Sequence, residues 1–152
     1  MATRVTIRDN GLGALTKRLK AFGKGLTLTV GVHASEGEAT QGRMTVAEIA
    51  TINEFGLGVP ERSFIRDWYD TNEATNRANL SKVAAAVLRG EYTPEAGLGR
   101  LGALFQGQIQ ARISGGIPPP NAASTIARKG SSTPLIDTGQ LRSSILWRVE
   151  RL

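Results

Sequence analysis

Residues 26–33 read LTLTVGVH, and every second side chain in this stretch is apolar up to Val32. Such alternation places one face of a strand against a core and leaves the other face toward solvent. Residues 144–151, SILWRVER, alternate in the same way. The two stretches predict strands that lie far apart in the sequence, and RVTIR, residues 4–8, predicts a shorter first strand.

Around these strands, apolar residues recur at spacings of three and four, which is typical of amphipathic helices. The spacing predicts a helix over residues 12–22 and a shorter one over residues 46–55. The longest predicted helix covers residues 64–89, with two apolar ends and a polar middle, and another follows over residues 94–113. A helix with this distribution is expected to bridge two packing surfaces, one of which can belong to a neighbouring subunit.

Capping residues support these boundaries. Thr45 and Glu48 have the spacing of a capping box, and Ser63 is expected to cap the longest helix. Thr93 followed by Pro94 is a strong helix start. Four glycines weaken the helix after it but permit the close approach of another helix: Gly97, Gly99, Gly102 and Gly107.

The order of these elements predicts an α+β fold in a single domain, residues 1–152. We expect a small antiparallel sheet with helices packed on one face, one long helix and extended loop arms. Two polar segments, residues 34–43 and 117–133, are predicted to be mobile and to become ordered against neighbours on assembly. The second contains Pro118 to Pro120, which favour extended geometry.

Charge is unevenly distributed along the chain, whose net charge is +6. Residues 1–24 carry +5, residues 25–61 carry −4 and residues 100–152 carry +5. A basic chain can bind nucleic acid, and it can equally present a solvated face or dock on an acidic protein. The chain has no cysteine, which excludes disulfides and thiolate metal sites. We expect no signal peptide and no membrane span.

The sequence offers little material for catalysis. His33 is the only histidine, and no second histidine or nearby carboxylate accompanies it as a general base would require. Asp67 and Asp70 lack further metal ligands at a suitable spacing. Gly97, Gly99 and Gly102 formally match a dinucleotide-binding fingerprint, but they lie inside a helix and follow no strand. We therefore predict that the chain is not an enzyme and has no cofactor and no metal.

Two segments resemble a known family. Residues 30–70 contain Gly31-Val32-His33, then Asn53-Glu54-Phe55-Gly56, then PERSFIR at residues 60–66. Residues 134–145 read PLIDTGQLRSSI. This pattern resembles the neck and tail-completion proteins of tailed phages, related to the lambda minor tail protein Z group and to the virion morphogenesis proteins of Mu-like phages. The Gly-rich insertion between the two segments has no counterpart in that pattern.

The resemblance implies a virion protein, assembled in the host cytoplasm, that forms a ring with six-fold symmetry around the DNA channel at the head–tail junction. It implies that the partners are copies of the chain and neighbouring neck proteins: a head-closure or stopper protein, and a tail terminator or tail tube. Non-specific contact with the DNA in the channel is expected, and contact with a membrane is not. A DNA-binding protein of phage DNA packaging or processing is the alternative. The candidate interface residues are Arg62, Phe64, Arg66, Trp68, Pro118, Pro119, Pro120, Arg128, Lys129 and Arg142. Of these, Arg62, Arg66 and Arg142 are expected to point at a partner or at DNA, and pairing within the chain with Asp67 or Glu61 is the alternative.

Overall fold

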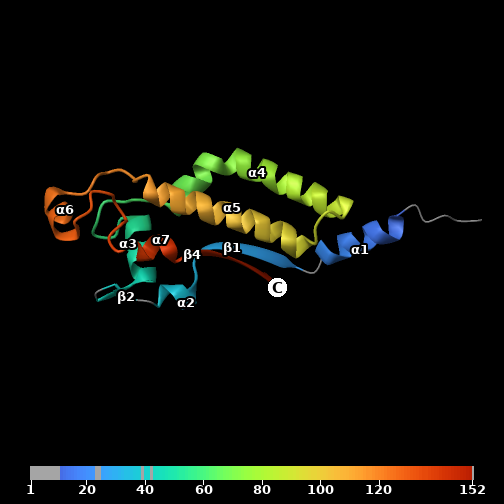
Figure 1. Cartoon of the computed structure of the whole chain (residues 1–152), viewed down its shortest axis with the longest axis horizontal. Helices are drawn as coiled ribbons and strands as arrows, with labels where there is room; N and C mark the ends of the chain where they lie inside the picture. The colour runs from blue at the N-terminus through green and yellow to red at the C-terminus, as the bar shows by residue number, and fades with distance from the viewer. Residues whose placement is uncertain (1–10, 23–24, 39, 42, 152) are drawn as a thin grey trace, which may run out of the picture.

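The computed structural model describes residues 11–22, 25–38, 40–41 and 43–151. The molecule is elongated, with two long antiparallel helices, α4 (Ile65–Arg89) and α5 (Pro94–Ser114), lying along its length over a two-stranded sheet (Figure 1). Helix α1 (Leu12–Phe22) extends from one end, and α6 (Ala123–Lys129) lies at the other. The fold is α+β with one long helix and a small antiparallel sheet, as predicted.

The main sheet pairs a strand near the start of the described chain with the strand at its end. Strand β1 (Leu26–Val32) pairs antiparallel with β4 (Ile145–Arg151) along its whole length. The two strands themselves were predicted from their alternation. In the pairing, three apolar residues of β1 lie opposite apolar residues of β4: Leu28 opposite Val149, Val30 opposite Trp147, and Val32 opposite Ile145. Helix α5 packs on this sheet and brings α4 with it. The strand predicted at residues 4–8 lies outside the described residues.

Helices α4 and α5 form a hairpin whose turn is fixed by backbone chemistry. Gly90 ends α4 in the left-handed conformation, at a φ of 83°. The Thr93 side chain accepts a hydrogen bond from the backbone amide of Ala96, which caps α5 as predicted. A β-carbon added at Gly97 would lie 2.7 Å from Val83 of α4, so this glycine does permit the expected close helix contact.

Gly102 has a different neighbour from the one expected. A β-carbon there would lie 2.7 Å from the Trp147 indole and 2.9 Å from Leu28, which both belong to the sheet. The close approach at Gly102 is therefore between helix and sheet, and it makes room for the largest side chain on β4. At Gly107 no atom lies within 4 Å of the added β-carbon among the described residues.

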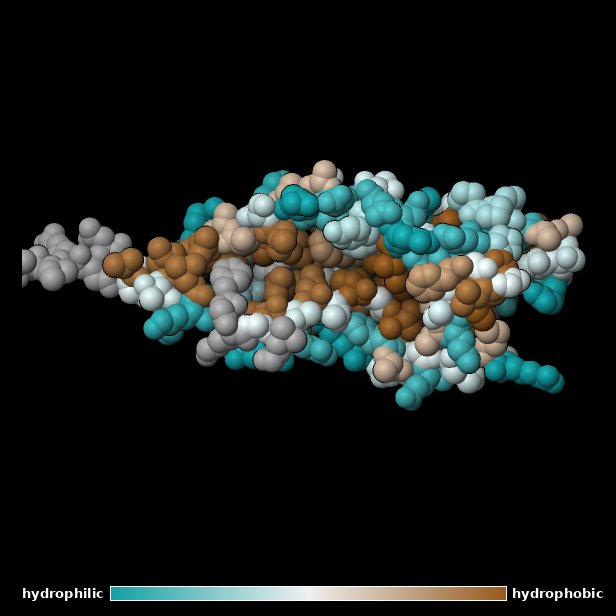
Figure 2. Space-filling model, turned by 180° about the vertical axis from the view of Figure 1, so that it is seen from behind, coloured by the Kyte–Doolittle hydropathy of each residue, from teal (hydrophilic) through white to brown (hydrophobic). Residues whose placement is uncertain are grey.

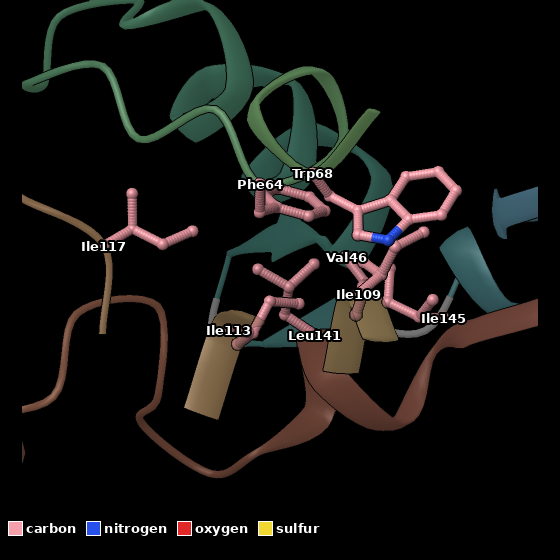
Figure 3. Close-up of a cluster of buried hydrophobic side chains, with 8 residues drawn as sticks. All are labelled: Val46, Phe64, Trp68, Ile109, Ile113, Ile117, Leu141 and Ile145. Carbon is pink, nitrogen blue, oxygen red and sulfur yellow. The ribbon is translucent and has the colours of Figure 1, made fainter. Parts of the chain in front are cut away.

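The core gathers side chains from distant parts of the chain (Figure 3). Helix α3 (Val46–Phe55) contributes Val46, and the short helix α7 (Gln140–Ser143) contributes Leu141. The other buried members come from the start of α4, from the second half of α5 and the residues after it, and from β4: Phe64, Trp68, Ile109, Ile113, Ile117 and Ile145. This core lies at the end of the molecule where α3 and α7 meet the hairpin.

The two segments that were predicted to be loops contain regular structure. The segment predicted as residues 34–43 contains a one-turn helix, α2 (Ala34–Gly37), and strand β2 (Thr40–Gln41), which pairs antiparallel with β3 (Met44–Thr45) just after the segment. In the proline-rich segment, α6 follows the three prolines and ends at Gly130 in the left-handed conformation. The sequence pattern missed these elements because short helices and two-residue strands carry too few positions to show a period.

Candidate assembly surfaces

A buried carboxylate organises the junction between α3 and α4. Glu54 is 9% exposed and accepts hydrogen bonds from the backbone amides of Phe64, Ile65 and Arg66 at 2.8, 3.1 and 3.0 Å. The Ser63 hydroxyl donates to the same carboxylate at 2.7 Å. The first amides of a helix have no partner inside it, and the positive end of the helix dipole favours an anion there. Glu54 therefore caps α4 from another helix.

This arrangement corrects the capping prediction. Ser63 does not cap the long helix, because its hydroxyl donates to Glu54. The helix begins at Ile65, one residue after the predicted start at residue 64. The Thr45–Glu48 capping box and the left-handed end of α3 at Gly56 are confirmed. Sequence proximity suggested Ser63, whereas only the tertiary fold brings Glu54 to the helix start.

Arg62 secures the proline segment from within the molecule. Its side chain is largely enclosed, since the residue is 8% exposed, and it donates to the carbonyl oxygens of Pro119 and Pro120 at 2.9 and 3.3 Å. Its backbone amide donates to the Asn53 carbonyl at 2.8 Å. Arg62 was expected to face a partner or DNA, and this expectation is wrong for the folded chain because its guanidinium is used internally.

Phe64 and Trp68 are also core residues. Phe64 is fully buried, and Trp68 is 7% exposed with its indole nitrogen donating to Gln108 at 3.0 Å. The Trp68 ring packs against Phe105 at a centroid distance of 5.2 Å. Both residues belong to the core, which corrects their selection as freely exposed interface residues, and both also form part of the inner wall of the apolar groove between α3 and α4.

Several other candidates converge on one open hollow at the α6 end. Its volume is about 530 Å³, and Pro119, Pro120, Arg128 and Lys129 line it together with Arg62. Burial lowers the pKa of Lys129, and the nearby positive charges of Arg62 and Arg128 act in the same direction, while Asp137 opposes them. The hollow is thus a basic surface with one acidic residue.

The remaining candidates lie apart from this hollow. Arg66 is exposed and forms an ion pair with Glu61. Arg142 is exposed on α7 and donates to the Ser114 hydroxyl at 3.2 Å. Pro118 is exposed and lines a separate shallow hollow with Asp67 and Arg112. The structure therefore leaves Arg66, Arg128 and Arg142 accessible to a partner, together with the prolines.

The groups considered for catalysis have structural contacts. The His33 Nε2 atom lies 3.2 Å from the carbonyl oxygen of Leu146. This contact connects the residue after β1 to the start of β4. Asp67 forms an ion pair with Arg112 at 2.6 Å. Within the described ranges, no three histidine or carboxylate side chains gather where they could hold a metal ion. No helix in the same ranges is both long enough and apolar enough to cross a bilayer.

Two apolar grooves flank α4. The first, of about 560 Å³, lies between α3 and α4 and is lined by Ala50, Thr51, Phe55 and Tyr69 among others. The second, of about 420 Å³, lies between α4, α5 and β1, and Tyr69 lines it too. Figure 2 shows hydrophobic surface on one face of the molecule, over α1 and in a band along the middle. Exposed apolar surface of this kind marks interaction sites.

A buried amide lies beside the second groove. Asn76 is 8% exposed, and neither its side-chain oxygen nor its nitrogen has a hydrogen-bond partner among the described residues. An unsatisfied buried amide lowers the stability of the fold. The sequence signal for Asn76 was its place in the polar middle of the long helix, but nothing there indicated that it would be buried.

The chain was compared with known protein families, curated proteins and solved structures. No protein-family model, no curated protein and no solved structure matches the chain.

Proposed function

We propose that this chain is a structural protein of a tailed-phage virion that forms a homo-oligomeric ring around the DNA channel at the head–tail junction. One observation carries the proposal: the two segments that resemble the neck and tail-completion family build one core. Val46, Phe64 and Trp68 of residues 30–70 cluster with Leu141 and Ile145 of residues 134–145, although residues 71–133 separate them in the sequence.

The contacts of the shared motif residues support a scaffolding role. Glu54 of the Asn-Glu-Phe-Gly motif caps α4, and Gly56 ends α3. In the second motif, Leu141 is 2% exposed and belongs to the core, and the Thr138 hydroxyl accepts a hydrogen bond from the Gln140 amide at 3.3 Å. These residues set the angles between helices and leave the outer surfaces available for partners.

The proposed partners are copies of the chain and the adjoining proteins of the neck, a head-closure or stopper protein on one side and a tail terminator or tail tube on the other. The surfaces available for them are the apolar grooves beside α4 and the basic hollow near α6. The ring would lie in the virion neck, and its channel face would contact DNA without reading its sequence.

Ring formation is tested with the purified chain. Native mass spectrometry and negative-stain electron microscopy should show closed rings of one stoichiometry. An antibody against the chain should label the neck of purified virions from a culture that produces them. A chain that stays monomeric at high concentration and is missing from virions would contradict the proposal.

The salt dependence of DNA affinity distinguishes the DNA-binding alternative from the structural proposal. Each lysine or arginine that neutralises a phosphate steepens the fall of affinity with salt. Several arginines are already paired with carboxylates, among them Arg66, Arg77, Arg89, Arg112 and Arg151. We expect duplex DNA to bind weakly and without sequence preference. DNA affinity that falls steeply with rising salt, in a chain that forms no ring, would favour the alternative.

A further inference from the structure

Helix α1 presents an apolar stripe that the described chain leaves partly exposed. Leu12, Leu15 and Leu19 share one side of the helix and are 70%, 37% and 52% exposed. The helix contacts the hairpin of α4 and α5, where the Arg18 guanidinium donates to the Leu88 carbonyl at the end of α4 at 2.9 Å. A helix of 11 residues is marginal on its own in water, since most helical stability in proteins comes from packing an apolar face. We therefore expect the leucine stripe of α1 to pack against another apolar surface.

The groove between α3 and α4 is a surface of the matching kind. It is open, about 560 Å³ in volume and mostly apolar, with Ala50 and Ile65 among its lining residues. Phe55 and Tyr69 also line it and are 60% and 53% exposed. An amphipathic helix binds such a groove through anchors spaced at three, four and seven residues, which is the spacing of Leu12, Leu15 and Leu19.

The charges of the two surfaces are complementary. Residues 12–22 contain three basic residues, Lys17, Arg18 and Lys20, and no acidic one. In α3 and the first part of α4, Glu48 and Asp70 are exposed acids that lie next in sequence to the groove residues Ala47 and Tyr69. The other acids there are engaged within the chain, Glu54 in capping α4 and Glu61, Asp67 and Glu73 in ion pairs with arginines. Opposite potentials guide two surfaces together and disfavour wrong pairings.

The two surfaces lie toward opposite ends of the elongated molecule (Figure 1). One copy therefore cannot be expected to satisfy itself. Two copies that exchanged the contact reciprocally would form a closed dimer, whereas the proposed ring requires that the contact pass from each copy to the next. A contact between two different surfaces of the same chain is heterologous, and it repeats from copy to copy until a ring closes or a filament grows. We infer that the apolar stripe of α1 from one copy docks in the α3–α4 groove of the next copy. The inference deepens the proposed function, because it names the contact that would build the ring, and ring closure itself rests on that proposal.

Cysteine cross-linking tests the contact directly, because the chain contains no cysteine of its own. The double variant Leu19→Cys, Thr51→Cys has one thiol on the α1 stripe and one at the groove, and both positions are exposed. Mild oxidation, or a short bis-maleimide, should produce a ladder of covalent dimers, trimers and higher multimers up to the closed ring. The single variants should each give no more than covalent dimers. A double variant that yields dimers alone or no cross-linked product overturns the inference.

A matched pair of substitutions separates the apolar contact from the charge of the helix. Leu15→Glu and Thr16→Glu change the charge of α1 equally and lie next to each other, but only Leu15 belongs to the stripe. Both side chains are exposed, so thermal unfolding of the monomer should be unchanged within error. Leu15→Glu should weaken self-association about tenfold or more, because burial of a leucine is lost, whereas Thr16→Glu should have a much smaller effect. Equal effects of the two substitutions would contradict docking through the stripe.

The outcomes distinguish this inference from the proposed function. If the wild-type chain forms rings while the double-cysteine variant yields no ladder, another contact builds the ring and only the inference fails. If sedimentation shows a monomer at every concentration and the double variant yields no ladder, both fail.

Discussion

At the scale of single residues, the most consequential side chain is Glu54. Its carboxylate accepts hydrogen bonds from three backbone amides and one hydroxyl at the junction of α3 and α4. Hydrogen bonds to an ionised acceptor are stronger than neutral ones, and a buried donor left without its partner is costly. The sequence indicates only that the Asn-Glu-Phe-Gly motif ends α3. In the structure, its glutamate also caps the start of α4.

Replacing Glu54 should destabilise the fold markedly. Glu54→Gln keeps the size of the side chain but removes its charge and turns one acceptor into a donor, so it should cost about 2–3 kcal/mol in the free energy of unfolding. Chemical denaturation followed by circular dichroism measures this loss. The control is Glu61→Gln, whose partner Arg66 is exposed, and it should cost less than about 1 kcal/mol. Equal losses would contradict the capping role.

Asn76 should be replaceable by leucine with a gain in stability. Its buried amide has no partner among the described residues, so Asn76→Leu removes an unsatisfied group and adds apolar contact, which should raise the free energy of unfolding by about 1 kcal/mol or more. The control is Asn72→Leu, because the Asn72 amide donates to the Trp68 carbonyl at 2.8 Å and this bond would be lost. A lower melting temperature for Asn76→Leu would mean that Asn76 is hydrogen-bonded in solution.

Glu48 provides a pH-dependent contribution through the capping box. The backbone amide of Thr45 donates to its carboxylate, and with the Thr45 hydroxyl it holds the pKa of Glu48 below the ordinary 4.5. Because the folded pKa is depressed, the stabilisation is present above the unfolded pKa and is lost as the pH falls through the folded pKa. An NMR titration of Glu48 should give a midpoint below 4.5, and Thr45→Val should move it upward. An unchanged midpoint would contradict the capping box.

At the scale of elements, helix α5 shows how one residue type has different roles within a single helix. Gly97 faces Val83 of α4, Gly102 faces Trp147 of the sheet, and Gly107 faces open space. Helical periodicity predicted the helix from the sequence, and its glycines suggested close packing. Which neighbour each glycine contacts follows from the placement of α5 between α4 and the sheet.

Two alanine substitutions in α5 should have opposite effects. Alanine is favoured over glycine in a helix by about 1 kcal/mol, so Gly107→Ala should stabilise the protein by about that amount. Gly102→Ala has the same intrinsic gain, but its β-carbon would lie 2.7 Å from the Trp147 ring and force it to move. We expect a net loss of stability in thermal unfolding, together with a changed tryptophan fluorescence. Similar gains for both would contradict the tight contact at Gly102.

At the scale of the whole molecule, the body and its two ends have separate roles. The core lies where α3, α7, the hairpin and the sheet meet, whereas α1 and α6 extend from this body at opposite ends (Figure 1). Helix α6 has no buried residue, so it adds little to the stability of the monomer. Surface without a role in the core is available for assembly.

Replacing α6 should separate folding from assembly. A Gly-Ser segment of equal length in place of residues 123–129 keeps the Pro119 and Pro120 carbonyls that Arg62 contacts. The melting temperature should fall only slightly. Under the proposed role in the virion neck, the formation of joined, infectious particles should be blocked in a complementation assay. The control is Arg62→Ala, which should lower the melting temperature clearly because a largely buried contact is lost. Joined particles that form normally without α6 would contradict an assembly role for this end.

Local patterns in the sequence determined most of the elements. The alternation of Leu28, Val30 and Trp147 determined the strands, and the capping box at Thr45 determined the start of α3, because strand periodicity and helix capping depend on residues a few positions apart. The tertiary structure alone decided which distant groups meet. Glu54 reaches the start of α4, Arg62 is enclosed by the prolines, and Phe64 and Trp68 belong to the core instead of the exposed surface. Burial depends on the packing of the whole chain, and no local spacing of residues encodes it.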